Sequence, residues 1–440
     1  MNFEITNLGQ CKISSPLITK FPSTDFGFVS DTEKILYDVK RYDAGNESEK
    51  SKICFEKAGP RKMVFYDPTR IRVAIITSGG LCPGINNVIR SIVMESHYRY
   101  GVQNILGIRY GFMGLNPATN YEPVELTPHM VRDAHKMGGT ILGSSRGGTE
   151  DMESIVDTLE RLYVNILYVI GGDGSLRAAH DVAVIAEKRN LKLSVIGVPK
   201  TIDNDVSYIQ RTFGFETAFS RAVDSIYSAH VEAEGAPNGI GLVKLMGRYS
   251  GFIAANSALA MNDVNFVLIP EVLFDLYGEN GFLHHLEQRL RRRGHAVICV
   301  AEGAGQNFLV TDQVKQERDA SGNIKLADIG VYLRDTINKY FKSIEMAVNL
   351  KYIDPSYMIR SAPANPNDAI FCALLGQYAV HAGMAGKTDM IVGQWNNIFT
   401  HIPIKMVTSK RNQVNPQSRF WHNVLEATGQ PANMLNHHQL

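Results

Sequence analysis

The sequence predicts an α/β protein built from two doubly wound, largely parallel sheets. Short β-branched runs alternate with stretches whose apolar residues recur at helical spacing, the pattern of parallel sheets covered by helices on both faces. Glycine-rich turns come directly after several predicted strands. The predicted strands are too many for one such sheet, so we expect two sheets, preceded by an N-terminal extension.

The first strand and helix follow directly from the residue pattern. Residues 72–77 read RVAIIT, a β-branched run typical of a buried parallel strand. The run stops at SGG, and apolar residues then recur three and four positions apart across 85–93, which predicts a helix.

The same order of elements repeats further along the chain. Apolar spacing predicts helices over 152–162 and 176–186. Predicted strands lie at 166–170, 194–198, 239–246, 264–269 and 296–301. Residues 1–70 lack this alternation and include the polar stretch DAGNESEKSK, so we expect an extension that packs on, or drapes over, the later core.

Composition excludes several classes of protein. The 440 residues allow two or three domains of roughly 150 residues each. The formal net charge of +1 argues against a dedicated nucleic-acid binder. No apolar run reaches the ~18 residues of a membrane helix, and the start shows no signal-peptide pattern. The five scattered cysteines form no CxxC pair, which favours a reducing, cytoplasmic location.

Five segments with chemically active residues come directly after predicted strands. They are SGG at 78–80, GGDGS at 171–175, PKTIDND at 199–205, MGR at 246–248 and AEG at 301–303. Because ligands bind at the carboxyl ends of strands in open parallel sheets, we expect the five to share one rim and form a binding cleft.

The GGDGS segment has the features of a polyphosphate site. Gly171, Gly172 and Gly174 let backbone N–H groups approach an anion, and a helix that begins near Ser175 adds its positive dipole end. Asp173 is an oxygen ligand suited to Mg²⁺. The alternative is a tight strand-to-helix turn capped by an aspartate. Two further glycine-rich turns, SGGLCPG and GGTILGSSRGG, favour the phosphate site. None of the three is a Walker A loop or a complete GxGxxG, which disfavours a nicotinamide enzyme.

PKTIDND is the most specific segment. Asp203 and Asp205 flank an asparagine at a strand end, so one carboxylate can accept a proton from an attacking hydroxyl while the other lies near a metal. Lys200 and Thr201 offer phosphate contacts. The alternative is an Asx-turn in which the acidic side chains cap their own backbone.

Arginines at three places match the needs of phosphoryl transfer. Arg146, Arg248 and Arg360 lie among small or flexible residues, and a guanidinium binds phosphate oxygens in pairs. Glu302 ends a strand and can accept hydrogen bonds from sugar hydroxyls. The arginines of 289–293 we assign instead to a helix C-terminus that precedes Gly294.

Seven motifs in order resemble the 6-phosphofructokinase family from about residue 70 to the C-terminus. They are SGGLCPGINNVIR, GGTILGSSRG, GGDGS, PKTIDND, MGR-x-SG, AEG and YMIR. The resemblance implies two Rossmann-like domains with the active site between them, and phosphoryl transfer to the 1-hydroxyl of fructose 6-phosphate. It implies a donor domain of 71–214 plus about 359–409, and a sugar-phosphate domain of 215–358 plus about 410–440.

The resemblance also implies roles for individual residues. It implies that Asp203 is the proton acceptor, with Arg146 and Arg248 beside the transferred group and Asp173 on Mg²⁺. The implied donor site comprises Gly80, Arg146, Gly147, Gly172, Asp173, Gly174 and Ser175. The implied fructose 6-phosphate site comprises Lys200, Thr201, Ile202, Asp203, Asp205, Met246, Gly247, Arg248, Glu302, Lys351, Tyr357, Met358, Ile359 and Arg360.

Two positions bear on the donor and conflict. Family members that use pyrophosphate typically carry Asp where this chain has Gly174, and that side chain fills the space of a nucleotide's α-phosphate. They also usually carry the lysine found here as Lys200. We weigh steric access more heavily and expect ATP, as in the plant and kinetoplastid enzymes that the sequence resembles. A pyrophosphate-dependent enzyme is the alternative.

Two other readings are a kinase acting on NAD or lipids and a catalytically silent phosphosugar-binding subunit. TIDND, MGR and YMIR disfavour the first, and the retained Asp173 and Asp203 disfavour the second. The chain departs from the bacterial family members at Gly239, where they have Arg, at Tyr357, where they have His, and at Met94 in their effector site. We therefore doubt regulation by ADP or phosphoenolpyruvate. The resemblance implies a homodimer or homotetramer.

Overall fold

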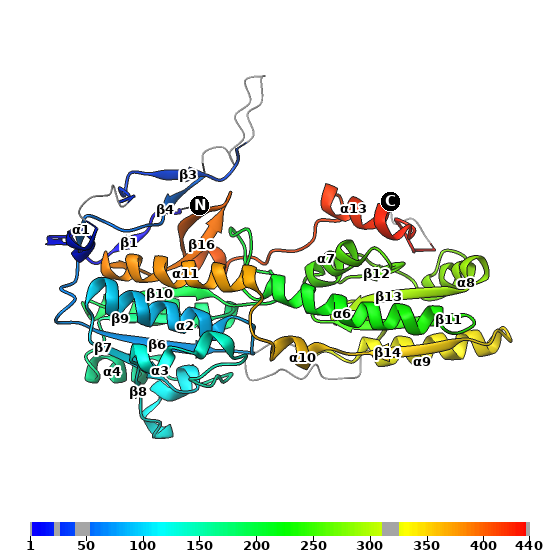
Figure 1. Cartoon of the computed structure of the whole chain (residues 1–440), viewed down its shortest axis with the longest axis horizontal. Helices are drawn as coiled ribbons and strands as arrows, with labels where there is room; N and C mark the ends of the chain where they lie inside the picture. The colour runs from blue at the N-terminus through cyan, green and yellow to red at the C-terminus, as the bar shows by residue number, and fades with distance from the viewer. Residues whose placement is uncertain (1, 22–26, 40–52, 310–324, 437–440) are drawn as a thin grey trace, which may run out of the picture. The chain divides into compact units, whose positions relative to one another are not determined.

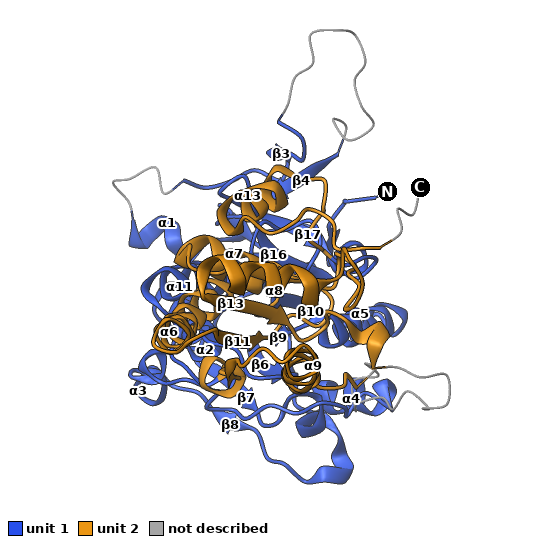
Figure 2. Cartoon of the chain, turned by 90° about the vertical axis from the view of Figure 1, so that its right-hand side faces the viewer, with its two compact units in different colours: residues 1–201, 206–214, 361–411 blue, residues 202–205, 215–360, 412–440 orange. Residues whose placement is uncertain are grey.

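A computed structural model describes residues 2–21, 27–39, 53–309 and 325–436. Contacts divide the chain into two compact units, shown in two colours in Figure 2. Unit 1 comprises residues 1–201, 206–214 and 361–411, and unit 2 comprises residues 202–205, 215–360 and 412–440. Each unit has its own sheet and its own hydrophobic core.

Unit 1 is built on a nine-stranded sheet with a parallel centre. Its strands, in order across the sheet, are β3 (Lys34–Leu36), β4 (Cys54–Lys57), β17 (Ile398–Pro403), β16 (Met390–Trp395), β10 (Ser194–Pro199), β9 (Ile166–Gly171), β6 (Arg72–Ser78), β7 (Asn104–Ile108) and β8 (Val124–Glu125). The five strands from β16 to β7 run parallel, and antiparallel strands complete both edges.

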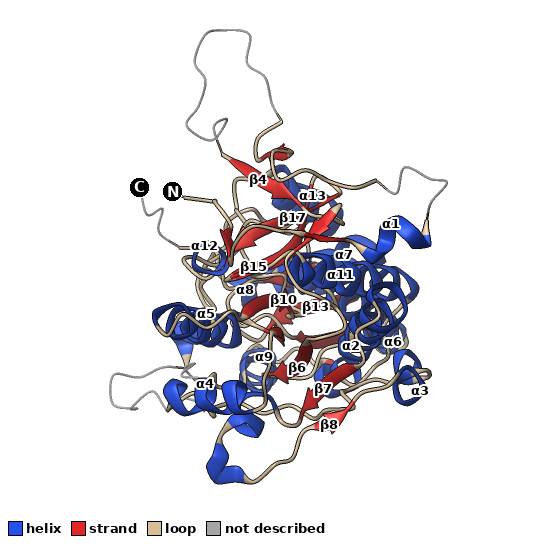
Figure 3. Cartoon of the chain, turned by 90° about the vertical axis from the view of Figure 1, so that its left-hand side faces the viewer, coloured by secondary structure: helices blue, strands red, loops and turns tan. Residues whose placement is uncertain are grey.

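Helices cover both faces of this sheet, as the sequence predicts (Figure 3). One face carries α4 (Met152–Arg161) and α5 (Asp173–Lys188), whose apolar residues pack on alternate positions of the central strands. The other carries α2 (Ile85–Met94) and α11 (Pro366–Met384), which run side by side (Figure 1). Shorter helices are α1 (Pro16–Lys20), α3 (Pro128–Val131), α12 (Ile404–Val407) and the π-helix η2 (Glu95–Tyr100).

The N-terminal segment is part of this unit's sheet structure. We expected residues 1–70 to pack on or drape over the core, but β3 and β4 extend the nine-stranded sheet beside β17. Two small pairs complete the attachment: β1 (Thr6–Asn7) with β15 (Lys387–Thr388), and β2 (Ile13–Ser14) with β5 (Met63–Val64). The whole polar stretch at 43–52 that we noted lies outside the described residues, as do 22–26.

Unit 2 is built on a four-stranded parallel sheet. The strand order is β12 (Phe266–Leu268), β13 (His295–Ala301), β11 (Gly239–Leu245) and β14 (Asn349–Ile353). Its helices are α6 (Phe215–Glu234), α7 (Phe252–Met261), α8 (Phe282–Arg293), α9 (Ile329–Ser343), α10 (Ser356–Arg360) and α13 (Arg419–Thr428). Helix α8 ends in its arginines before Gly294, which has a positive φ of 75°, so the predicted helix end is confirmed.

Alternation along β11 places different helices on the two faces of this sheet. Ile240 and Leu242 join the core formed with α8 and α9. Gly239 and Gly241 face α6, where an added Cβ would lie 2.0 Å from the Ala233 carbonyl oxygen and 2.6 Å from that of Ala229. Helix α6 therefore packs so closely on β11 that no side chain fits at Gly239.

The five active segments do not share one rim, so that prediction is wrong. SGG, GGDGS and PKTIDND follow β6, β9 and β10 of the nine-stranded sheet, whereas MGR and AEG follow β11 and β13 of the four-stranded one. Strand alternation alone does not tell which strands share a sheet. In the described ranges, no helix combines the length and the apolar character that crossing a membrane requires.

Candidate active site

Three loops of unit 1 leave neighbouring parallel strands at one edge of the sheet. The registers pair Ser78 with Gly171 and Gly171 with Pro199, so β6, β9 and β10 end level with one another. The SGG, GGDGS and PKTIDND segments therefore begin side by side. The carboxyl edge of a parallel sheet is where such folds bind ligands.

Lys200 connects two of these loops. Its side chain is buried, and its Nζ donates a hydrogen bond of 2.7 Å to the Gly80 carbonyl oxygen. A Cβ at Gly79, which has a φ of +91°, would come within 3.2 Å of the same Nζ. Because Gly79 and Gly80 have no side chains, the Lys200 side chain can reach the SGG turn. The hydrogen bond to the Gly80 carbonyl oxygen fixes its ammonium group at the edge of that loop.

The GGTILGSSRGG segment lies against the SGG turn. The Gly79 N–H donates to the Ser145 carbonyl oxygen at 2.9 Å, and the Ser144 hydroxyl donates to the Gly79 carbonyl oxygen at 2.7 Å. This pairing brings the guanidinium of Arg146 beside Gly80, with Nη2 3.8 Å from a Cβ built there. Gly147 follows in the left-handed region at a φ of 89°.

Asp173 opens helix α5 and faces two arginines. Its carboxylate lies 2.5 Å from Arg177 Nη2, one helical turn on, and 3.6 Å from Arg411 Nη2. Gly172 precedes it as N-cap, and Ser175 is buried in the first turn. The helix begins at Asp173, two residues before the predicted start. The positive end of the helix and three arginines, including Arg146, thus form an anion-binding edge.

The region around Asp173 fits a magnesium–polyphosphate complex. Mg²⁺ in such sites takes one or two carboxylates and completes its shell with phosphate oxygens and water. Asp173 is partly exposed, and a Cβ added to the adjacent Gly174 meets no atom within 4 Å. Open space therefore lies next to the Asp173 carboxylate, at Gly174.

The PKTIDND segment is divided between the units. Lys200 and Thr201 belong to unit 1, where the Thr201 carbonyl oxygen accepts a 2.6 Å hydrogen bond from the Thr212 hydroxyl. Residues 202–205 belong to unit 2, and the chain returns to unit 1 at Val206. Within unit 2, Asn412 holds this short segment by donating to the carbonyl oxygens of Asn204 and Asp205. Ile202 is buried.

Asp203 carries a perturbed carboxyl group in unit 2. Burial raises its pKa, and the nearby carboxylates of Asp205 and Glu302 raise it further, to about 7. The positive charge of Arg360 and a hydrogen bond from the Arg248 backbone oppose the rise. The Asp203 carbonyl oxygen accepts a 2.8 Å hydrogen bond from the Ser250 hydroxyl. A general base with a pKa near neutrality is well matched to work at physiological pH.

The MGR and AEG turns interlock beside this acid. They follow adjacent strands whose register pairs Leu245 with Ala301. The Gly303 N–H donates to the Gly247 carbonyl oxygen at 3.1 Å, and a Cβ at Gly303 would lie only 2.0 Å from the Arg248 carbonyl oxygen. The close approach orients Arg248 and Glu302 relative to each other. Met246 is buried within this packing.

The remaining predicted residues divide into two groups. Arg360 ends α10 and is close enough to Asp203 to influence its pKa, whereas Tyr357 and Met358 are strongly exposed and Ile359 is buried. Lys351 lies in β14 opposite Gly241 of β11, five residues before Met246. At about 3.3 Å per residue, this places Lys351 roughly 16 Å along the strand from the MGR turn. Unit 2 alone does not bring Lys351 to that turn.

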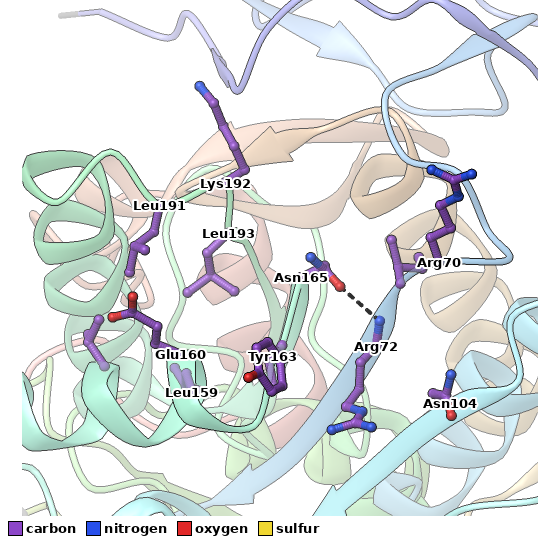
Figure 4. Close-up of a pocket in the computed structure, with 13 residues that line it drawn as sticks. Arg70, Arg72, Asn104, Leu159, Glu160, Tyr163, Asn165, Leu191, Lys192 and Leu193 are labelled. Atoms are coloured by element: carbon purple, nitrogen blue, oxygen red, sulfur yellow. Dashed lines mark hydrogen bonds between the residues drawn. The ribbon is translucent and has the colours of Figure 1, made fainter.

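A separate cavity of about 470 Å³ in unit 1 lies away from these loops (Figure 4). Its lining includes Arg72, Asn104, Asn165 and Leu193, which stand at the amino ends of β6, β7, β9 and β10. The Arg72 N–H donates to Asn165 Oδ1 at 2.9 Å across its rim. Because the cavity lies at the opposite edge of the sheet from the glycine-rich loops, we do not assign it to catalysis.

The sequence reasoning missed two arginines at the donor edge. Arg177 follows Asp173 by four residues on a predicted helix, a spacing that signals a pair on one face. Arg411 lies more than two hundred residues further along, and no local pattern connects it to Asp173.

Comparisons of the sequence with known proteins show which family this chain belongs to. The family model described as Phosphofructokinase matches residues 72–383. An ATP-dependent 6-phosphofructokinase of Borreliella burgdorferi is 51% identical over 99% of this chain and 98% of its own length. One of Trypanosoma brucei brucei is 43% identical over 91% of this chain and 82% of its own.

A solved structure shares the fold at lower sequence identity. A pyrophosphate-dependent phosphofructokinase from Marinobacter aquaeolei aligns with a TM-score of 0.66 at 20% identity, covering 81% of this chain and 91% of its own. At that identity the likeness concerns the fold alone. The resemblance inferred from the seven motifs is confirmed: this chain belongs to the phosphofructokinase family.

Proposed function

We propose that this protein is an ATP-dependent 6-phosphofructokinase. It transfers the γ-phosphoryl group of ATP to the 1-hydroxyl of fructose 6-phosphate, a step of glycolysis that yields fructose 1,6-bisphosphate and ADP. The observation that carries this proposal is Asp203, an acid with a pKa raised to about 7 beside Asp205, Glu302 and the backbone of Arg248. Relatives of nearly full length that bear this name support it.

Asp203 acts as the general base in the proposed reaction. Its carboxylate accepts the proton of the 1-hydroxyl as that oxygen attacks the γ-phosphorus. Glu302 binds sugar hydroxyls, and Arg248 and Arg360 offset negative charge on phosphate oxygens. Lys200, Thr201, Ile202, Asp205, Met246, Gly247, Tyr357, Met358 and Ile359 complete the proposed sugar-phosphate contacts.

The donor edge of unit 1 positions the nucleotide phosphates. Backbone N–H groups at 172–175, the α5 N-terminus and Arg146 bind the polyphosphate, and Gly80 and Gly147 leave room for it. Asp173 would hold Mg²⁺, which would supply positive charge to offset that of the polyphosphate. Arg177 and Arg411, which pair with Asp173 in the structure, add charge at the same edge.

ATP is the proposed donor because of the space at Gly174. A Cβ there meets no atom of the described residues within 4 Å, so a nucleotide phosphate has room beside Gly174. Lys200 is bound to the Gly80 carbonyl oxygen and can serve either donor. A second candidate, pyrophosphate dependence, is favoured only by the presence of that lysine.

We also propose a cytoplasmic homodimer or homotetramer. None of the five cysteines, all of which the structure describes, forms a disulfide, and a reducing compartment favours thiols. Lys351 lies far along β14 from the MGR turn, so we propose that it binds the sugar phosphate of a neighbouring subunit. Glycolytic phosphofructokinase activity is consistent with this location.

The test is a pair of coupled assays on the purified chain with fructose 6-phosphate and Mg²⁺. One arm supplies ATP and the other pyrophosphate, and fructose 1,6-bisphosphate is measured. We expect turnover with ATP and little with pyrophosphate. Turnover with pyrophosphate but not with ATP would show that the enzyme is pyrophosphate-dependent. Turnover with neither donor would refute phosphofructokinase activity.

A further inference from the structure

Three side chains of the kind that bind metals gather at the amino edge of the sheet in unit 2. His230 and Glu234 lie one turn apart near the end of α6, and His295 is the first residue of β13. The potential ligand atoms all lie within 4.8 Å of one another. His230 Nε2 is 3.5 Å from one Glu234 oxygen, and His295 Nε2 is 4.0 Å from the other.

These distances are close to those of a tetrahedral zinc site. With Zn–N and Zn–O bonds of about 2.0–2.2 Å, tetrahedral ligand atoms stand roughly 3.3–3.5 Å apart. The observed separations run from 3.5 Å up to 4.8 Å, so the ligand atoms must approach by up to about 1.5 Å through side-chain torsions when the ion binds. Glu234 is half exposed and carries its carboxylate on a long, adjustable side chain, whereas both histidines are largely buried.

The backbone around the cluster is tightly packed. Gly239 at the start of β11 is in register with His295, and it admits the α6 backbone at Ala233, between His230 and Glu234 in the helix. His230 Nδ1 is buried and makes no hydrogen bond within the described residues, so Nε2 is the nitrogen offered to the cluster. The two imidazole rings are 5.7 Å apart and set edge to face.

The cluster is remote from the proposed acceptor site. His295 and Glu302 stand at opposite ends of β13, seven residues apart, which is roughly 23 Å of strand. The Arg289 guanidinium lies nearby and donates to the His295 carbonyl oxygen, so it does not compete for the imidazole.

We propose that His230, Glu234 and His295 form a zinc site that joins α6 to β13. Two imidazoles and one carboxylate suit Zn²⁺, whereas Mg²⁺ and Ca²⁺ prefer oxygen ligands alone. Three protein ligands leave the fourth position to water or an external ligand. Without metal, the same residues form a histidine–glutamate cluster at 3.5 and 4.0 Å.

Metal titration of the full chain tests the proposal. The protein is dialysed against a chelator, and Zn²⁺ binding is measured at pH 7.5 by competition with a chromophoric chelator. We expect one equivalent of Zn²⁺ more in the wild type than in His295→Gln or His230→Gln. His422→Gln, which removes an exposed histidine of α13 in the same unit, is the matched control and retains that equivalent.

Two further measurements distinguish loss of the zinc ligands from misfolding of the site variants. Co²⁺ added to the wild type should give the visible d–d absorption of a four-coordinate site, and this absorption should be absent in His295→Gln. Zn²⁺ should raise the melting temperature of the wild type and of His422→Gln but not of the two site variants. Equal Zn²⁺ stoichiometry in wild type and site variants, or a wild type without the Co²⁺ absorption, would overturn the proposal. Kinase activity is a separate readout and should persist in His230→Gln.

Discussion

At the scale of single residues, the carboxyl group of Asp203 has the most consequential environment. It lies with Asp205 and Glu302 in unit 2, and the charge of Arg360 and a hydrogen bond from the Arg248 backbone partly offset the repulsion among these acidic side chains. Desolvation and like charge both disfavour its ionised form. The same environment that raises its pKa makes it a stronger base once ionised.

Replacement of Asp203 by Ser should remove most of the catalytic rate but leave the binding of fructose 6-phosphate nearly unchanged. We expect kcat to fall by about 10²–10⁴, because a positioned base contributes roughly that factor, while the KM for fructose 6-phosphate changes little. Steady-state kinetics measures both. Asp224→Asn, an exposed carboxylate on α6, is the control and should behave as wild type. Near-normal kcat in Asp203→Ser would remove Asp203 from the role of base.

The dependence of kcat/KM on pH should reflect the ionisation of Asp203 within its cluster of carboxylates. Asp203 must be ionised to act, so kcat/KM should fall as the pH drops below about 7. Asp205→Asn removes a neighbouring negative charge, which stabilises the Asp203 anion and lowers its pKa. The acid limb should therefore move to lower pH, by about one unit. An unchanged acid limb, or a shift to higher pH, would contradict this assignment.

Gly174 should control the choice of donor. Gly174→Asp places a carboxylate in the open space beside Asp173, where it would repel and obstruct a nucleotide's α-phosphate. We expect kcat/KM for ATP to fall by at least about tenfold, as for loss of a well-placed ionic contact. Gly174→Ala is the matched control, because its methyl group meets no atom within 4 Å. ATP kinetics unchanged in the Asp variant would refute the steric argument.

At the scale of elements, the turns after β11 and β13 form a single interlocked unit. Gly247 has a φ of +122°, and a Cβ there would lie 2.4 Å from the Ser250 carbonyl oxygen. Gly303 approaches the Arg248 carbonyl even more closely. The glycines of MGR and AEG therefore serve backbone packing, and their contribution to binding is to position Arg248 and Glu302.

Gly303→Ala should misplace the MGR turn. A Cβ 2.0 Å from a backbone oxygen forces that turn to move, and displacements of about 1 Å at a site can cost roughly 10²-fold in kcat/KM. Kinetics with fructose 6-phosphate, together with circular dichroism to establish folding, measures the effect. Gly235→Ala, whose Cβ would be 3.2 Å from its nearest neighbour, should lose much less. Equal kinetics in the two variants would show that the interlock is unimportant.

At the scale of the whole molecule, a buried ionic network ties the N-terminal segment to distant strands. Glu56 of β4 accepts contacts from Arg61 at 3.1 Å, Lys387 at 3.0 Å and His401 at 2.9 Å. Asp31 pairs with Arg61 and Lys387 at its outer side. Asp31, Glu56 and Arg61 are thereby joined to Lys387 and His401. Because Glu56, Arg61, Lys387 and His401 are buried, separating them would leave charged groups buried without partners.

Glu56→Gln should destabilise the protein strongly. The change removes the buried carboxylate shared by Arg61 and Lys387 and leaves them the more exposed Asp31, and breaking a buried ion pair typically costs about 3–5 kcal/mol. Urea unfolding at pH 7 measures the loss. Glu33→Gln breaks an exposed pair with Lys57 and should have a small effect. Comparable losses in the two variants would mean that the buried network contributes no more than a surface pair.

The same network should make stability fall in acid. The contacts lower the pKa of Glu56 from 4.5 to about 2. Its contribution is therefore fully present above about pH 4.5 and is lost as the pH falls toward 2. Burial also lowers the pKa of His401. The unfolded state therefore binds a proton at this ring more readily than the folded state, which adds to the loss of stability below the ordinary pKa of histidine. The Glu56→Gln variant should show a shallower decline of unfolding free energy between pH 4.5 and 3 than the wild type.

The sequence by itself predicted the strands β6, β9, β10, β11, β12 and β13, the helices α2, α4 and α5, and the chemistry of the motifs that follow several of these strands. It did not predict β7, β14, β16 or β17, nor the helices α6, α7 and α11. Helical and strand periodicity and the conformational freedom of glycine act over a few residues, so Asp173 at a helix start and Asp203 after a strand could be recognised locally. The strands β3 and β4 could not, because both are short. Strand β4 joins the sheet through β17, far along the chain, and β3 is attached through β4.

Only the tertiary structure decided which of these residues meet. It separated the five segments onto two sheets, brought Arg411 to Asp173, and joined His295 to the end of α6. Such contacts depend on sheet order and close packing between elements distant in sequence, as at Gly239 against Ala233. No local pattern of residues encodes them, because the free energy that selects them comes from the folded core as a whole.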